Sequence, residues 1–313
     1  MNLKPFIFFL LCLWAPFFQA IVGRSYPKQV KITRYYLESL RRTRVDRALG
    51  FEEAKARIVM KDGWLEADGN DSAAQQNIEA ITFIQRGDMP RAKALLLEIS
   101  KKSPQFFPGR FNLGKVYLYF KDHHHARIEF IRARNLVPQY WMNYYYLGRA
   151  YELEGDHNMA LYNYRIAYLR NPFDFISLIA MGDLLIEKKR LTEAKTVFRF
   201  CLDLDDGYNN ALIGMGKVAY HYKEFYDATI WFRAVDIDRP YKKELHYYYA
   251  ESAFFSRFYK KAVEQYKMIL NFPQDAIYSR ISLTRMRARL RQSQRLALEK
   301  DSEISSDYKA EDK

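Results

Sequence analysis

Two adjacent stretches of equal length decide the fold: residues 107–140, FPGRFNLGKVYLYFKDHHHARIEFIRARNLVPQY, and residues 141–174, WMNYYYLGRAYELEGDHNMALYNYRIAYLRNPFD. The same residue types return in the second stretch 34 residues after their place in the first. Leu-Gly, Tyr, Ala, an aromatic residue, Ala and Pro recur in that order, at 113–114, 117, 126, 130, 133 and 138 and then at 147–148, 151, 160, 164, 167 and 172. A fixed interval of this kind predicts stacked supersecondary units rather than one globular core.

The interval extends in both directions without an insertion. It predicts six units over residues 73–276, at 73–106, 107–140, 141–174, 175–208, 209–242 and 243–276. Four units place Pro at the closing position, where it ends a helix because it cannot donate the backbone hydrogen bond. Asp206 and Gln274 stand there in the fourth and sixth units.

Small residues recur where two helices of one unit are expected to cross. Gly or Ala occupies one such position in the first half of each unit, and Ala occupies another in the second half, at 92, 126, 160, 194, 228 and 262. Close crossing requires small side chains. A Leu or aromatic residue at 96, 130, 164, 198, 232 and 266 is expected to fill the space between units.

This pattern resembles the tetratricopeptide repeat (TPR) family, which places Leu-Gly, Tyr, Ala, Phe, Ala and Pro at fixed offsets along a helix-turn-helix. An ordinary helical bundle and the pentatricopeptide and Sel1-like repeats are the alternatives, and the constant interval with Leu-Gly before Tyr favours the TPR interpretation. The resemblance implies an all-α fold, an α-solenoid that forms a right-handed superhelix of six helix-turn-helix units with flanking N-terminal and C-terminal helices.

The first residues are typical of an export signal. One Lys at position 4 precedes an apolar run from Phe6 to Phe18, so we expect residues 1–25 to be a signal peptide or, if uncleaved, an N-terminal membrane anchor. A buried helix of a cytosolic protein is the remaining alternative. Lipidation at Cys12 is disfavoured, because Leu11 stands where a lipoprotein signal has a small residue.

Two basic segments flank the units. Residues 26–72 are expected to form a basic helical segment and a linker, and residues 277–300 a basic helix that caps the last unit. The final residues 301–313 are polar and are predicted to be disordered. Most of the net charge of +13 lies in these flanks, and the units themselves are close to neutral.

This charge distribution argues against nucleic acid as a partner, because such a protein would line its main surface with Lys and Arg. The basic flanks are compatible with simple solvation, with an acidic protein partner or with contact to a membrane surface.

The sequence shows no signature of catalysis. It contains no nucleophile elbow, phosphate-binding loop, paired metal motif or dinucleotide fingerprint. His123, His124 and His125 are expected in the turn between two helices, where they cannot all face one metal ion. Cys201 takes a packing position. We therefore expect no catalytic residue, metal, cofactor or small-molecule substrate.

The resemblance implies a concave groove lined by the first helix of each unit, with tyrosines beside charges of both signs. Carried over by position, the groove residues are Asn77, Phe111, Lys115, Tyr119, Tyr145, Arg149, Asp183, Lys217, Tyr220, His221, Tyr247 and Glu251. Such a surface suits an extended or helical peptide. The Lys and Asn set with which some family members hold a C-terminal carboxylate is not reproduced.

The function expected from the sequence is a non-enzymatic scaffold or adaptor in the bacterial cell envelope. It would be periplasmic or anchored to the inner membrane facing the periplasm, and would bind protein partners in the groove as part of a multiprotein assembly. The alternatives are a glycan or peptidoglycan-associated protein and a regulatory subunit of an envelope enzyme.

Overall fold

The computed structural model describes residues 57–69, 71–172, 175–235, 243–271 and 283–311. The expected leader and most of the basic segment that follows it lie outside these residues. The described part begins with two strands and continues with thirteen helices. The strands are β1 (Arg57–Lys61) and β2 (Trp64–Asp68).

The helices form six consecutive pairs and one final single helix. The pairs are α4 (Ser72–Gln85) with α5 (Met89–Lys102), α6 (Phe107–Tyr119) with α7 (His123–Leu136), α8 (Trp141–Glu154) with α9 (His157–Arg170), α10 (Phe175–Glu187) with α11 (Leu191–Leu204), α12 (Asn209–His221) with α13 (Phe225–Arg233), and α14 (Lys243–Phe255) with α15 (Tyr259–Asn271). We call these pairs units 1 to 6. The final helix is α16 (Leu283–Glu311).

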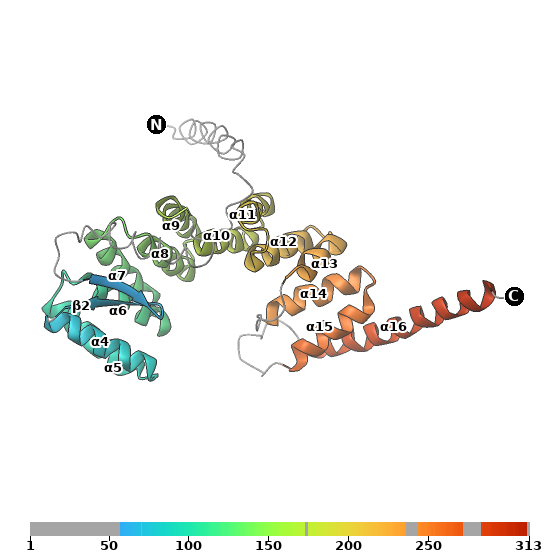
Figure 1. Cartoon of the computed structure of the whole chain (residues 1–313), viewed down its shortest axis with the longest axis horizontal. Coiled ribbons are helices and arrows are strands. Elements are labelled where there is room, and N and C mark those ends of the chain that lie inside the picture. The colour runs from blue at the N-terminus through green and yellow to red at the C-terminus, as the bar shows by residue number, and fades with distance from the viewer. Residues whose placement is uncertain (1–56, 70, 173–174, 236–242, 272–282, 312–313) are drawn as a thin grey trace, which may run out of the picture.

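Each helix packs on the next one along the chain, and first helices of neighbouring units also touch within units 1 to 3 and within units 4 to 6. The array is an α-solenoid that bends into an arch, with α8 and α10 on the inner side of the bend and α9 and α11 on the outer side (Figure 1). We call the surface formed by α4, α6, α8, α10, α12 and α14 the first-helix surface.

Glycines of the first helices lie directly against aromatic rings. A Cβ added at Gly148 would be 2.5 Å from the Tyr164 ring, and one at Gly216 would be 2.4 Å from the Phe232 ring. Phe198 lies between Gly182 of its own unit and Gly214 of the next. The recurring glycine therefore makes room for the recurring ring, while the recurring Ala of each second helix is fully buried beside it.

The turns inside the units share one backbone conformation. One residue in the turn that follows the first helix has a positive φ, between 58° and 88°, in all six units: Gly87, Lys121, Gly155, Lys189, Lys223 and Arg257. An aspartate then caps the second helix in units 1 to 3, as when Asp156 accepts a hydrogen bond of 3.1 Å from the amide of Met159.

The helical segment and linker expected over residues 26–72 are wrong over residues 57–68. These residues form an antiparallel hairpin, in which Lys61 pairs with Trp64 across Asp62 and Gly63. Both turn residues have positive φ, 49° and 83°, which is the conformation that an Asp-Gly pair favours in two-residue hairpin turns. Ile58, Leu65 and Ala67 are buried, so the hairpin belongs to the core of the first units.

The prediction that residues 301–313 are disordered is wrong up to residue 311, because α16 continues to Glu311. Its first half packs on α15 and joins the core of units 5 and 6 through Met286, which is 1% exposed. Its last part extends beyond the array (Figure 1). The polar composition of residues 301–311 favoured a prediction of disorder, although their backbone is helical.

Candidate functional site

The hairpin lies on the first-helix surface of units 1 and 2, where β2 contacts α4 and α6. Two buried asparagines hold one residue of the strand. The amide of Leu65 donates to Asn112 Oδ1 at 3.0 Å, and the carbonyl of Leu65 accepts from Asn77 Nδ2 and Asn112 Nδ2, both at 2.8 Å. A bond of 2.9 Å from Asn112 Nδ2 to Asn77 Oδ1 joins the two amides.

Lys115 holds the tip of the hairpin. Its Nζ donates to the carbonyl of Gly63 and lies 3.9 Å from the centre of the Trp64 ring, with the Tyr146 ring at 5.5 Å. Burial lowers the pKa of the Lys115 amine to about 8. Trp64 thus packs against the array, and this ammonium group contacts the chain's own hairpin.

Three of the expected groove residues are therefore not free to bind a partner. Asn77 and Phe111 are fully buried, the first under β2 and the second among Phe130, Tyr140 and Tyr146. Lys115 is partly covered by the hairpin. The assignment of Asn77 and Phe111 to an open groove was wrong, because the Asn77 amide is bonded to β2 and the Phe111 ring is packed between units 2 and 3.

Glu251 also serves the interior. It is 2% exposed, accepts a hydrogen bond from the Tyr266 hydroxyl, and lies 3.9 Å from the guanidinium of Arg289 on α16. Arg289 in turn covers the Phe254 ring at 4.3 Å. The expectation that Glu251 lines the groove was wrong, since its carboxylate helps to attach α16 to unit 6.

The two expected groove residues of unit 3, Tyr145 and Arg149, remain partly exposed. Arg149 pairs with Glu152 on the same helix at 2.9 Å, and Tyr145 contacts the rings of Tyr146 and Tyr164. Burial and the Glu152 charge raise the pKa of the Tyr164 hydroxyl, which donates to that carboxylate. Tyr119 lies apart from this group at the end of α6, where it is 61% exposed.

The other expected groove residues come together on units 4 to 6. Lys217 Nζ on α12 lies 3.2 Å from Asp183 on α10 and 3.4 Å from Glu244 on α14, so one ammonium links three first helices. Burial lowers the pKa of this amine, but the two carboxylates outweigh it and the net shift is upward. Burial and the Lys217 charge lower the pKa of His221.

Aromatic side chains of α12, α13 and α14 contact one another on the same units. The Tyr220 and Tyr248 rings meet edge to face at 5.0 Å, Tyr247 and Tyr248 at 5.7 Å, and the Phe255 ring stacks on Phe225 at 4.6 Å. We call Lys217, Tyr220, His221, Tyr247, Tyr248 and Phe255 together the tyrosine surface. None of the six is fully buried, and Phe255 is 45% exposed.

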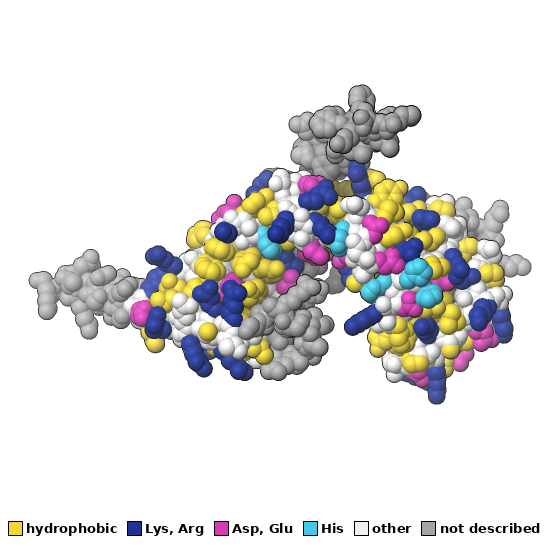
Figure 2. Space-filling model, turned by 180° about the vertical axis from the view of Figure 1, so that it is seen from behind, with side chains coloured by type: hydrophobic (Ala, Val, Ile, Leu, Met, Phe, Trp, Pro, Cys, Tyr) yellow, Lys and Arg dark blue, Asp and Glu magenta, His cyan; other side chains and the backbone are white. Residues whose placement is uncertain are grey.

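In Figure 2, hydrophobic side chains lie beside Lys and Arg side chains on the lobe that holds the C-terminal units.

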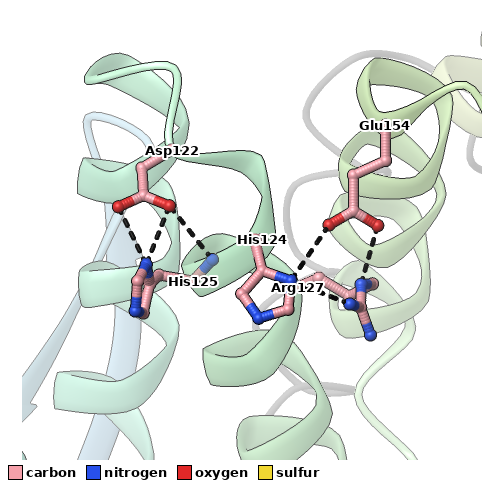
Figure 3. A network of polar contacts seen from close by, with 5 residues as sticks. All are labelled: Asp122, His124, His125, Arg127 and Glu154. Carbon is pink, nitrogen blue, oxygen red and sulfur yellow. Dashed lines mark hydrogen bonds and ion pairs between the residues drawn. The ribbon is translucent and has the colours of Figure 1, made fainter.

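The three consecutive histidines form the first turn of α7 rather than the turn before it. Asp122 holds His125 through its Nδ1 at 2.9 Å, while His124 faces Arg127 and Glu154, which themselves pair at 2.7 Å (Figure 3). The His124 and His125 side chains therefore contact different partners. In the part of the chain that the structure describes, no three His, Cys, Asp or Glu residues are placed to hold a metal ion.

The described helices also include none whose length and apolar character would let it cross a bilayer.

No protein-family model matches the sequence, and no curated protein matches it. Solved structures do match. A tetratricopeptide repeat protein from Parabacteroides merdae aligns with a TM-score of 0.58 at 18% identity, over 75% of this chain and 93% of that one. The chain has the tetratricopeptide-repeat fold.

Two further matches with this fold come from unrelated assemblies. PilW, a widely conserved type IV pilus biogenesis factor, aligns with a TM-score of 0.57 at 15% identity, over 66% of this chain and 97% of PilW. The Cut9-Hcn1 hetero-tetramer of APC/C aligns with a TM-score of 0.60 at 15% identity, over 85% of this chain and 50% of that one. At these identities the likeness concerns the fold alone.

Sequence reasoning missed the hairpin, Asn112, Glu244 and Tyr248. The Asp62-Gly63 pair between alternating apolar residues was a usable hairpin signal, although residues 62–71 also have the composition of a linker. Asn112 and Tyr248 lie one position after those that the TPR pattern assigns to the groove. The family positions therefore indicate the correct helix face but not every side chain on it.

Proposed function

We propose that this chain is a non-enzymatic scaffold of the bacterial cell envelope that holds a protein partner on the tyrosine surface. The observation that carries the proposal is the grouping of partly or fully exposed aromatic and charged side chains from α12 and α14 on the first-helix surface. Tyrosines with aromatic neighbours give a rigid contact area, which is typical of the residues that dominate protein interfaces.

The electrostatics of the tyrosine surface support a peptide or protein ligand. Lys217 is already neutralised by Asp183 and Glu244, so a partner does not have to supply a full negative charge. A bound segment would instead bury aromatic area and form hydrogen bonds with the tyrosine hydroxyl groups.

The envelope location rests on the N-terminal sequence, and the TPR-fold likeness to PilW is compatible with it. A basic residue followed by an apolar run would direct the chain to export. The exposed arginines of α16, such as Arg295, would give a second contact to an acidic partner or to anionic headgroups.

Pull-down from solubilised envelopes tests the proposal. Tagged wild-type protein is compared with a Tyr247→Ser/Phe255→Ser variant and with Tyr162→Ser, which alters a residue 57% exposed on α9, outside the first-helix surface. We expect a stoichiometric protein partner with wild type and Tyr162→Ser, and its loss with the double variant. Equal recovery with all three proteins would contradict the proposal.

Peptidoglycan fragments provide the second arm of the experiment. If they bind in a saturable way, and if the double variant loses that binding while protein capture is absent, the glycan alternative replaces the protein scaffold.

A further inference from the structure

The hairpin occupies its part of the first-helix surface as a ligand would. The hydrogen bonds from Asn77 and Asn112 to β2 go to backbone atoms, and between them they satisfy both the amide and the carbonyl of Leu65. Contacts to the main chain do not depend on which side chain a strand carries there. The pair is therefore suited to hold an extended segment of any polypeptide whose neighbouring side chains fit.

The side chains of the strand define that fit. Leu65 is fully buried and Ala67 is 1% exposed, whereas Glu66 between them is only partly covered. Alternate residues of a strand point to the same face. The surface of units 1 and 2 thus accepts a bulky aliphatic residue followed two positions later by a small one.

The hairpin is held by the helices rather than by itself. An isolated two-stranded hairpin is marginally stable in water, and β1 and β2 form the whole sheet within the described residues. An incoming strand that makes the same two asparagine contacts and buries the same side chains would offset most of the cost of removing β2.

We propose that the first-helix surface of units 1 and 2 is a binding site for an extended strand, that β2 fills it within the same chain, and that a partner strand enters by displacing the hairpin. The ligand class is an extended peptide with a large aliphatic residue and a small residue at positions i and i+2. The proposal does not depend on the tyrosine surface, which is formed by units 5 and 6.

A trans-binding experiment on the full chain tests this site. The probe is a fluorescent peptide of residues 62–69, DGWLEADG, and the receptor is the Leu65→Asp chain, in which a buried carboxylate would expel β2 from its place. We expect saturable binding to Leu65→Asp and binding at least about tenfold weaker to wild type. Adding Asn112→Ala to Leu65→Asp should remove binding, and a DGWDEADG peptide should not bind either variant.

The proposal is overturned if a Leu65→Asp chain with native helix content does not bind the peptide, or if wild type binds it equally well. Hydrogen exchange on wild type covers the case in which the variant does not fold. The amide of Leu65 should exchange through a local opening that leaves α8 protected. Exchange of Leu65 only together with α8, in global unfolding, would show that the hairpin does not leave, and the proposal would fall.

Discussion

Glycine against an aromatic ring is the residue contact on which units 2 to 5 depend. A Val at Gly216 would place atoms inside the space of the Phe232 ring, where a single added Cβ already comes within 2.4 Å. We expect Gly216→Val to lower the free energy of unfolding by about 2 kcal/mol or more, since overpacking forces rotamer and backbone shifts. Urea denaturation followed by circular dichroism measures the loss.

Gly207→Val is the matched control for this substitution. A Cβ at Gly207 would meet nothing closer than Asp205 Oδ1 at 3.7 Å, and the residue lies in the turn between units. Its effect should stay within about 0.5 kcal/mol. Equal destabilisation by both changes would show that the ring contact is not what makes glycine necessary.

Lys115 gives the stability a dependence on pH. Burial lowers its pKa from 10.5 to about 8, so between these values the unfolded chain binds a proton that the folded chain does not. Stability relative to Lys115→Met should therefore rise from pH 8 to pH 10.5, by on the order of 1 kcal/mol. Urea unfolding of both proteins at pH 7.5 and pH 10 measures the free energy of unfolding of the wild type minus that of Lys115→Met. A value that falls between pH 7.5 and pH 10 would contradict the buried position of the amine.

At the scale of the helix and its turn, the same backbone conformation is built from different residues. Lys189 has a φ of 58°, where Gly155 has 88° at the equivalent place. A non-glycine residue in this region loses roughly 1 kcal/mol. We expect Lys189→Gly to raise the free energy of unfolding by about 0.5–1 kcal/mol, and Lys188→Gly, one residue earlier outside the positive-φ position, to give no gain.

Helix capping gives a second test at this scale. The Asp156 side chain accepts the bond from the amide of Met159 that begins α9. Asp156→Ala should cost about 1 kcal/mol, while Asn158→Ala, on the exposed first turn of the same helix, should cost much less. Thermal unfolding monitored at 222 nm compares the two, and an equal loss would mean that the cap bond contributes little.

The elements that could be predicted from the sequence are those that repeat. Gly, Ala, the ring and Pro return at a constant interval because each unit meets the same neighbours, so one copy informs the reading of the next. The hairpin and the end of α16 occur once and have no second copy to indicate them. For the same reason, the burial of Asn77 was not predictable, since it depends on contacts with Leu65 and Asn112.

Across the whole molecule, the two ends of the array are closed in different ways. β2 covers units 1 and 2, and α16 covers unit 6 through Met286 and the Arg289 contact with Glu251. Solenoids require such coverage because their terminal units expose apolar surface. We expect the surface that is open without rearrangement to lie on the units between and beside these closures, while units 1 and 2 would accept a strand only after β2 leaves.

Truncation tests the closure at the C-terminal end. Removing residues 283–313 should expose the apolar face of α15 and leave the buried Glu251 without Arg289, so amides of α14 and α15 should lose hydrogen-exchange protection while those of α6 keep it. Removing only residues 302–313 should leave both regions protected. Uniform loss along the array after the longer truncation would contradict a stack whose units contact only their neighbours.

The central claim is that the open first-helix surface of the C-terminal units is where a partner is held. Site-specific photo-crosslinking in cells tests it most directly, with a benzophenone side chain placed in turn at Tyr247, at Phe255 and, on α9, at Tyr162. We expect one discrete crosslinked protein from Tyr247 and Phe255 and none from Tyr162. Crosslinks from Tyr162 alone, or the same products from all three positions, would contradict it.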